Sequence, residues 1–349
     1  MKILYFTKYT RKGASSRLRS FQYFPFLESQ GNQVTVKPLF DDAYLESLYQ
    51  GKKDSIGSLK GYFKRFFLLF TVFRYDRVVI EKELFPYIPA VFERVLALFG
   101  VNYVVDYDDA IFHNYDRHPN PVIRFVLKNK IDVVMQKSGT VIAGNSYLAE
   151  RAQNAGAKNV VIIPTVIDTN RYQIKEFTDS KPFVIGWIGS PSTFKYLKPL
   201  QPVFKKLAQD HAIALHIVGA TESLGLPSIE KHIPWSEETE VASILTFDVG
   251  IMPLNDTPWE KGKCSYKLIQ YMGCGIPVIA SPVGMNVEVV KEDVNGFLAT
   301  NEAEWLNSFL HYLSNAEQQH LHGKNNSIFV EYHFSLKSAQ HNYFKAIAN

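Results

Sequence analysis

The segment FVIGWIGSPST, residues 183–193, decides the fold of this chain. Its apolar part, Phe183–Ile188, predicts a buried strand, because short runs rich in branched and aromatic residues are typical of parallel strands covered on both faces. The small residues of 189–193 predict a turn, and a helix is expected from about Phe194. This order of strand, turn and helix opens an α/β unit in the middle of the chain.

The same order of features opens the chain at its N-terminus. The strand Lys2–Thr7 leads into Gly13-Ala-Ser-Ser16, and a helix is expected from about Arg17 with Ser15 or Ser16 as its N-cap. A pattern that starts twice predicts an α/β fold with two Rossmann-like, doubly wound domains. Two such domains are expected to face a central cleft, with ligands at the carboxyl ends of the strands.

Strands and helices alternate through both halves. The polar segment Asp168–Pro182 lacks periodicity and is interpreted as a linker. We expect one domain over residues 1–170, a second over 180–334, and a C-terminal helix within 335–349 that packs back on the first. The other predicted strands are Gln33–Lys37, Arg77–Glu81, Asn102–Asp106, Thr140–Ala143, Val160–Pro164, Ala214–Val218, Val249–Met252, Pro277–Ala280 and Phe297–Ala299, and the predicted helices include Phe92–Phe99, Pro121–Lys137, Ser146–Ala155 and Leu336–Ala348.

Composition narrows the class of protein. With 349 residues, 46% hydrophobic and 21% charged, the chain is long enough for two globular cores. A net charge of +4 gives no nucleic-acid signature. The two cysteines, Cys264 and Cys274, form neither a disulfide framework nor a zinc motif. The apolar start is too short for a signal peptide and no run of about 20 apolar residues exists, so we expect a cytoplasmic protein.

The segment 248–299 contains most of the candidate functional residues. A loop with Gly262 precedes a helix expected from about Ser265 to Met272. Free backbone N–H groups and the helix dipole make such a start suitable for a diphosphate, and Lys261, Lys263 and Lys267 add positive charge there. A solvated helix start that happens to carry lysines is the alternative.

Three stretches of this segment resemble the family 4 glycosyltransferases, which have the GT-B fold. The run KLIQYMGCGIPVIAS, residues 267–281, resembles the motif helix and next strand of that family, and residues 282–288 and 295–298 are similar to the family's later part of the same signature. The resemblance implies a retaining, metal-independent glycosyltransferase of the group 1 type. It also implies that a nucleotide-sugar donor binds mainly to the C-terminal domain and an acceptor mainly to the N-terminal domain.

The resemblance also assigns roles to single residues. The family has two glutamates separated by seven residues; the ribose-binding one corresponds to Gln270, and the one near the donor sugar corresponds to Gly262, which leaves only a backbone N–H there. A family arginine near the diphosphate is Ser190 in this chain, while the lysine five positions later is retained. The diphosphate-binding prediction therefore comprises Gly13, Lys195, Gly262, Lys263, Cys264, Ser265 and Lys267, and the ribose- or sugar-binding prediction comprises Gln270 and Glu288.

Several of these assignments have plain structural alternatives. Gly13 is expected to allow close backbone approach and a positive φ, although every strand-to-helix connection needs some turn here. Lys195 fits a surface lysine equally well, and Glu288 fits an acid that stabilises a helix start. Cys264 lies where a helix start lowers a thiol pKa, yet we interpret its side chain as packing.

The acidic sequence DYDD, residues 106–109, ends a predicted strand. Crowded carboxylates raise one another's pKa, so we predict Asp108 and Asp109 as catalytic residues that orient the acceptor or stabilise charge. Helix capping with solvated loop acids is the alternative. Asp106 and Asp108 also match the aspartate pair that holds a divalent metal in the GT-A fold, but the second start at residue 183 opposes that fold, and no metal site is predicted.

The segment 52–77 is basic and aromatic. Its centre, KGYFKRFFLLFTVFR at residues 60–74, is flanked by Lys52, Lys53 and Arg77. Such helices lie in membrane interfaces and attract anionic lipid, whereas a core helix with basic ends is the alternative. We expect peripheral contact with the inner face of the cytoplasmic membrane, which would suit a lipid-linked acceptor.

Three functions are compatible with the sequence. The first is transfer of a sugar from a UDP- or GDP-sugar to a glycan or lipid-linked acceptor in the assembly of a surface polysaccharide or glycolipid. The second is a nucleotide-sugar epimerase of the same fold, and the third is a non-catalytic nucleotide-sugar-binding partner of another transferase, which Gly262 supports.

Overall fold

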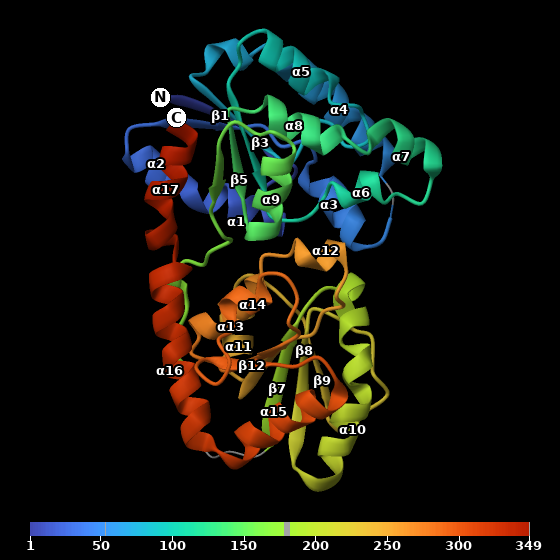
Figure 1. Cartoon of the computed structure of the whole chain (residues 1–349), viewed down its shortest axis with the longest axis vertical. Coiled ribbons are helices and arrows are strands. Elements are labelled where there is room, and N and C mark those ends of the chain that lie inside the picture. Colours follow the sequence, from blue (N-terminus) through green and yellow to red (C-terminus); the bar gives the residue numbers. More distant parts are fainter. Residues whose placement is uncertain (53, 178–181, 349) are drawn as a thin grey trace. The chain divides into compact units, whose positions relative to one another are not determined.

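A computed structural model describes residues 1–52, 54–177 and 182–348. The chain divides into two compact units, each built on one parallel six-stranded sheet (Figure 1). The fold class predicted from the sequence, α/β with two doubly wound units, is confirmed. Unit 1 comprises Met1–Thr165, Gly262–Cys264 and the residues from Ala339 onward; unit 2 comprises Val166–Lys261 and Ser265–Ser338.

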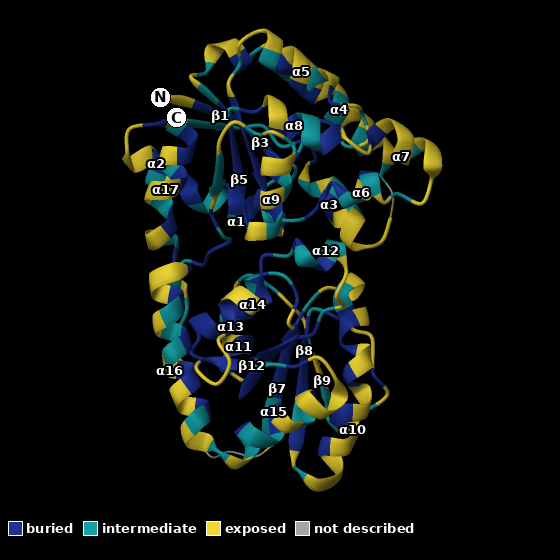
Figure 2. Cartoon of the chain, in the orientation of Figure 1, coloured by how far each residue is buried: buried dark blue, intermediate teal, exposed yellow. Residues whose placement is uncertain are grey.

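The sheet of unit 1 has the strand order β2-β1-β3-β4-β5-β6, and all its pairs are parallel. Its central strands are almost fully buried, as their dark blue colour in Figure 2 shows, because helices cover both faces. The strands are β1 (Lys2–Phe6), β2 (Gln33–Val36), β3 (Arg77–Glu81), β4 (Tyr103–Tyr107), β5 (Thr140–Ala143) and β6 (Val160–Ile162). The helices are α1 (Ala14–Arg19), α2 (Phe24–Ser29), α3 (Asp42–Tyr49), α4 (Ser55–Leu69), α5 (Val91–Leu98), α6 (His113–Asp116), α7 (Pro121–Leu127), α8 (Lys130–Lys137) and α9 (Ser146–Asn154), with 3-10 turns η1 (Phe21–Tyr23) and η2 (Val72–Arg74).

The C-terminal residues belong to unit 1. The last helix, α17 (Leu336–Ala348), stacks Tyr343 on Tyr23 with ring centroids 3.8 Å apart. Arg77, at the start of β3, donates from Nε to the carbonyl oxygen of Ile347 at 3.1 Å. These contacts tie the end of the chain to the sheet of unit 1.

The sheet of unit 2 has the order β12-β11-β10-β7-β8-β9, again with parallel pairs only. Its core gathers around Trp187 of β7, which is 1% exposed. The strands are β7 (Phe183–Ile188), β8 (Ile213–Val218), β9 (Glu230–Ile233), β10 (Val249–Met252), β11 (Val278–Ala280) and β12 (Gly296–Leu298). The helices are α10 (Gln201–Asp210), α11 (Glu240–Ile244), α12 (Pro258–Lys261), α13 (Tyr266–Gly273), α14 (Asn286–Val289), α15 (Glu302–Ser314) and α16 (Ala316–His333), with 3-10 turns η3 (Thr169–Arg171), η4 (Pro191–Tyr196) and η5 (Lys198–Leu200).

Three local predictions were wrong. No α-helix begins near Phe194; the segment forms η4 and η5, and α10 begins only at Gln201, because prolines at 191, 199 and 202 lack the N–H that a continuing helix needs. The helix predicted for 121–137 is two helices, α7 and α8, separated at Asn129, a residue type whose side chain competes with helical hydrogen bonds. The edge strand β9 was not predicted, because its sequence EKHI is half charged and does not look buried.

Candidate functional site

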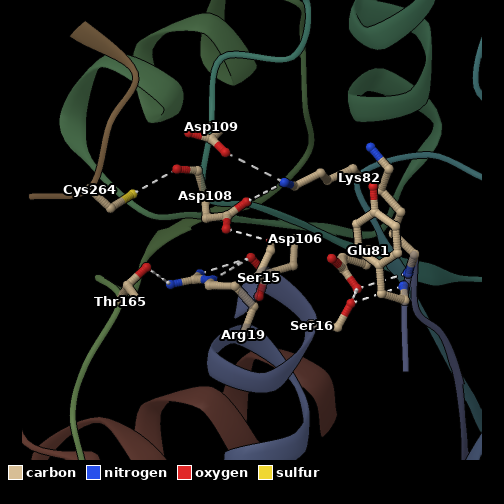
Figure 3. Close-up of polar contacts among 12 residues, drawn as sticks. Ser15, Ser16, Arg19, Glu81, Lys82, Asp106, Asp108, Asp109, Thr165 and Cys264 are labelled. Carbon is tan, nitrogen blue, oxygen red and sulfur yellow. Dashed lines mark hydrogen bonds and ion pairs between the residues drawn. The ribbon is translucent and has the colours of Figure 1, made fainter. Parts of the chain in front are cut away.

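The acidic cluster of unit 1 forms where three neighbouring strands end. β1, β3 and β4 are adjacent and parallel, so their carboxyl ends bring the residues after Phe6, Glu81 with Lys82, and the acids of 106–109 to one edge of the sheet (Figure 3). This is the edge at which doubly wound sheets bind ligands. The structure thus places Asp108 and Asp109 where the sequence predicted them.

Asp106 has a structural partner. Its Oδ1 lies 2.8 Å from the Nη2 of Arg19, and both side chains are almost fully buried. Arg19 also donates from Nη1 to the carbonyl oxygen of Ile163 at 2.8 Å. A buried carboxylate neutralised by a guanidinium is a poor ligand for a divalent ion, so the Asp106-x-Asp108 pair does not fit the metal-binding alternative.

Asp108 is held by Lys82 and Ser15. Lys82 Nζ lies 2.8 Å from Asp108 Oδ1, and the Ser15 hydroxyl donates to Asp108 Oδ2 at 2.5 Å. Burial opposes ionisation of Asp108, but the Lys82 ammonium and these hydrogen bonds outweigh it and lower the pKa of Asp108 to about 2. Asp108 is therefore an anion at neutral pH and cannot accept a proton there.

Asp109 has a different environment. Its side chain is 36% exposed, and its Oδ2 lies 3.6 Å from Lys82 Nζ. Burial and the neighbouring Asp108 charge raise the pKa of Asp109, whereas Lys82 and Lys263 counteract the shift. Two adjacent carboxylates with pKa values pushed apart are chemically suited to different roles, and Asp109 is the more exposed of the two. A catalytic role for either aspartate remains a prediction.

Lys82 was missed by the sequence analysis. It has a positive φ of 66°, which is strained for a residue with a side chain, and it directly follows the last residue of β3. In this backbone conformation the buried Lys82 ammonium points toward Asp108 and Asp109. Burial would lower the pKa of Lys82, but Asp108, Asp109 and Glu81 together raise it, so the lysine stays charged.

Glu81 was missed as well. Its Oε2 accepts hydrogen bonds from the Ser16 hydroxyl at 2.6 Å and from the backbone N–H of Lys8 at 2.9 Å. The prediction that Ser15 or Ser16 is the N-cap of the first helix is therefore wrong. Their hydroxyls donate to Asp108 and Glu81 instead, and α1 begins earlier, with Gly13 as its N-cap. The charged pair at the end of the strand 77–81 was the signal that could have identified these residues.

Gly13 allows a close approach to Tyr9, but its backbone does not have a positive φ. Its φ is −74°, and a Cβ at this position would lie 2.5 Å from the Cβ of Tyr9. The positive-φ part of the prediction is therefore wrong. Within unit 1, Gly13 shapes the turn that presents Ser15 to Asp108.

Besides Gly13, three residues of the predicted diphosphate set belong to unit 1: Gly262, Lys263 and Cys264. Asn145 Nδ2 donates to the carbonyl oxygen of Lys263 at 3.0 Å, and the Cys264 thiol donates to the carbonyl oxygen of Asp108 at 3.1 Å. Burial raises the pKa of the Cys264 thiol, so the expected lowering by a helix start does not occur and the packing interpretation holds. Gly262 lies against Ala110.

Replacing Gly262 with alanine is expected to destabilise the protein. The new Cβ would lie 2.7 Å from the backbone nitrogen and 3.0 Å from the Cα of Ala110, atoms that move only with the chain. Overpacking of this kind costs about 1–3 kcal/mol, measurable as a lower denaturant midpoint with an unchanged m-value. The comparison variant is Gly225→Ala, at an exposed position of unit 2 with a φ of +80°, where the new Cβ would meet Gln201 Nε2 only at an ordinary contact distance of 3.8 Å, so its effect reports backbone strain without overpacking. An unchanged midpoint for Gly262→Ala would contradict the assignment of this glycine to close packing.

Two of the remaining diphosphate candidates, Ser265 and Lys267, lie in unit 2 at the start of α13. Lys267 Nζ lies 5.0 Å from the centroid of the Trp187 ring, and the backbone N–H of Ile188 donates to the Tyr271 hydroxyl at 2.8 Å. Since Trp187 and Ile188 end β7, these contacts place the helix start at the carboxyl edge of the second sheet. Ser265, the N-cap, has a φ of 49°.

A second loop supports that helix start. The Ser265 hydroxyl donates to Asn286 Oδ1 at 2.7 Å, and Asn286 Nδ2 donates to the carbonyl oxygen of Ser281 at 3.0 Å. Gly284, with a φ of 55°, lies so close to Lys261 that a Cβ would be 2.7 Å from its carbonyl oxygen. The segments before α13 and after β11 therefore hold each other in place.

Three further candidates are placed differently from one another. Lys195 is exposed on η4, with Nζ 5.0 Å from the centroid of the Tyr196 ring, and Glu288 is exposed on α14. Gln270 is buried, and its Nε2 donates to the Tyr172 hydroxyl at 3.2 Å. A ribose-binding role for Gln270 remains a prediction.

The partners of Gln270 were not found from the sequence. The Tyr172 hydroxyl donates to Glu240 Oε1 at 3.3 Å, and Trp235 Nε1 donates to Glu240 Oε2 at 2.8 Å. Trp235 follows β9, so this network reaches the carboxyl edge of the second sheet with a 40% exposed indole. Glu260, another buried acid that was missed, accepts a hydrogen bond from Tyr196.

The comparisons with known proteins agree with this architecture. Residues 182–315 match the family model described as Glycosyl transferases group 1. None of the curated proteins matches the chain in sequence. The described residues contain no group of three or more His, Cys, Asp or Glu side chains that could hold a metal ion.

Solved structures match over nearly the whole length. HepE from Anabaena, in complex with UDP-glucose, is 18% identical, with a TM-score of 0.73 and coverage of 100% of this chain and 99% of that one. Sucrose-phosphate synthase from Thermosynechococcus elongatus is 13% identical, with a TM-score of 0.73 and coverage of 99% and 98%. A glycosyltransferase from Rickettsia africae is 13% identical, with a TM-score of 0.74 and coverage of 100% and 99%. At these identities, the matches establish a shared fold.

Proposed function

Because residues 182–315 form a group 1 glycosyltransferase domain and the chain has the GT-B fold, we propose that this enzyme transfers a sugar from a nucleoside diphosphate sugar to a hydroxyl of a glycan or lipid-linked acceptor. The observation that supports it most is Lys267 at the start of α13, beside the carboxyl end of β7. A lysine and free backbone N–H groups at a helix start suit a diphosphate. UDP is the first nucleotide to test, since HepE has been solved with UDP and UDP-glucose.

The proposed chemistry needs no resident metal. The acceptor oxygen forms a bond to the anomeric carbon while the bond from that carbon to the diphosphate oxygen breaks, and the acceptor proton passes to the leaving phosphate. Configuration is retained. Lys267 and the start of α13 stabilise the charge that develops on the leaving diphosphate. Asp109, which is partly exposed and has a raised pKa, orients the acceptor hydroxyl, and Asp108 stays ionised beside it.

The direct test is ligand-dependent thermal unfolding of the full chain followed by a transfer assay. Ligand that binds the folded state raises the midpoint in proportion to the logarithm of its concentration over Kd. We expect UDP and UDP-sugars to raise it and inorganic phosphate to leave it unchanged. Absence of any shift with both UDP and GDP would overturn the proposal.

The assay also separates the alternative functions. An epimerase would convert a nucleotide sugar without any acceptor. A non-catalytic partner would bind the donor and neither hydrolyse nor transfer its sugar across a panel of acceptors. Release of free nucleotide that depends on an added glycan or lipid-linked acceptor is the outcome expected for a transferase.

A further inference from the structure

Helix α4 has an inverted pattern of burial. Only Arg65 and Leu69 of this helix are buried, and Arg65 Nη2 donates to the carbonyl oxygens of Thr7 at 2.7 Å and Lys37 at 2.9 Å. Its aromatic side chains point outward instead: Phe67 is 65% exposed and Phe70 is 68% exposed. A soluble helix normally shows the opposite arrangement, so α4 is not a core helix.

Neighbouring elements extend this apolar surface. Phe73 of η2 lies 6.4 Å from Phe99, measured between ring centroids, and Leu98 at the end of α5 is 82% exposed. Figure 2 shows α4, α5 and α7 with much of their outward surface in yellow. We call Phe67, Phe70, Phe73, Leu98 and Phe99 the aromatic face.

Helix α7 continues the surface from α5. Val91 of α5 and Val126 of α7 line the same shallow hollow, with Arg94 beside them. Val126 is 56% exposed. Among the residues that the structure describes, none covers these side chains, and contiguous exposed apolar surface of this kind marks an interaction site.

The exposed charged residues of α4, α5 and α7 are all positive. Residues 55–75 and 117–131 contain no aspartate or glutamate, although the whole chain has a net charge of only +4. The acid of α5, Glu93, is buried and accepts a hydrogen bond from the backbone of Leu84. The exposed charges within these segments are therefore basic: Lys60, Lys64, Arg74, Arg94, Arg124 and Lys128. Asp76, an exposed acid just after η2, accepts a hydrogen bond from the backbone N–H of Lys2.

One member of the segment predicted for membrane contact, Arg77, does not contribute to this charge. Arg77 is half-buried and donates to the carbonyl oxygens of Ile347 and Ala348. Lys53 lies outside the described residues. The surface extends instead to α5 and α7, which the sequence analysis did not include.

We propose that the aromatic face inserts into the interfacial layer of a membrane that contains anionic lipids. Exposed phenylalanines supply apolar surface for the acyl boundary, and the surrounding lysines and arginines match anionic headgroups. No helix among the described residues has the length and apolar character needed to cross a bilayer, so α4 lies along the surface. The proposal is independent of the sugar donor, so its failure and that of the proposed activity are distinguishable.

The test is co-sedimentation of the full chain with vesicles of phosphatidylcholine alone and with about one third phosphatidylglycerol. We expect at least about tenfold stronger binding to the anionic vesicles, reduced by high salt. The double variant Phe67→Ser/Phe70→Ser should lower binding about tenfold or more, and Lys60→Glu/Lys64→Glu should abolish the preference for anionic lipid. Since all four side chains are exposed, the melting temperature should remain that of the wild type.

Matched controls come from unit 2. Ile328→Ser/Tyr332→Ser removes two exposed apolar side chains of α16, and Lys205→Glu/Lys206→Glu reverses two exposed charges of α10. Both should leave vesicle binding unchanged. Equal binding of the aromatic-face and control variants would overturn the proposal. A second result would also overturn it: the wild-type chain does not bind vesicles but forms a dimer, and the variant Phe67→Ser/Phe70→Ser is a monomer. The aromatic face would then be an interface between two copies of the chain.

Discussion

Lys82→Met is expected to lower the rate of sugar transfer by about 100-fold or more and to destabilise the fold at the same time. Lys82 is buried and lies 2.8 Å from Asp108 and 3.6 Å from Asp109. Removing one partner of a buried ion pair leaves an uncompensated charge, which costs about 3–5 kcal/mol. Methionine keeps the length of the side chain and the strain of the positive φ, so the substitution isolates the charge.

The double variant Lys82→Met/Asp108→Asn separates catalysis from stability. Removing both charges eliminates the unpaired carboxylate, so we expect most of the lost free energy of unfolding to return. Transfer should stay about 100-fold slow, because the Lys82 ammonium that lies 3.6 Å from Asp109 Oδ2, and so holds the carboxylate that orients the acceptor hydroxyl, is still missing. The measurements are denaturant unfolding and the initial rate at saturating donor.

Lys158→Met is the matched control, an exposed lysine of unit 1 for which we expect wild-type behaviour in both measurements. If the double variant recovered its transfer rate together with its stability, the cluster would be a structural ion pair only. That result would contradict the catalytic role proposed for the carboxyl end of β4.

Most of the fold could be predicted from the sequence, because buried parallel strands leave a local signal. The strands Arg77–Glu81, Thr140–Ala143, Phe183–Ile188 and Val249–Met252 were predicted with the bounds that the structure has. The failures are also physical. The edge strand β9 carries charges because one side of it faces solvent, and the proline-interrupted segment before α10 has no helical period to recognise.

The candidate site could be predicted only in part. Asp108 and Asp109 stand out because they follow one strand, whereas Lys82 and Ser15 reach them from β3 and α1. That encounter depends on the strand order β1-β3-β4, which no local pattern encodes. The different pKa shifts of the two aspartates follow from these contacts, so the sequence could not assign them separate roles.

The exposed aromatic residues of α4 are a second case in which the sequence left two structural alternatives open. The composition of residues 60–74 allowed a core helix or a membrane helix. Burial of Arg65, which is bonded to backbone carbonyl groups, turns the phenylalanines outward and removes the first alternative. The positions of the hydrophobic residues alone do not predict which face of a helix is buried when an arginine occupies that face.

Lys267→Met is expected to raise the Kd for UDP by about 10- to 100-fold. A charge-assisted hydrogen bond to a phosphate contributes about 1.5–3 kcal/mol, and each 1.4 kcal/mol is about a factor of ten in affinity. The change should cost the fold little, since the ammonium contacts the Trp187 ring at 5.0 Å and such a contact contributes about 0.5–2 kcal/mol, while methionine retains the apolar stem. Isothermal titration with UDP and with uridine measures the effect.

Uridine makes this experiment specific, because it lacks the diphosphate. If Lys267 binds the diphosphate, the variant has a weaker affinity for UDP and an unchanged affinity for uridine. If Lys267 acts only through its contact with the Trp187 ring, the affinities for both ligands fall together. Lys205→Met, an exposed lysine on α10, should behave as the wild type with either ligand and controls for loss of one positive charge from unit 2. An unchanged affinity of Lys267→Met for UDP would remove the diphosphate from the start of α13. The carboxyl edge of the second sheet would then need another cation, and Lys195, exposed on η4 after β7, would be the residue to test.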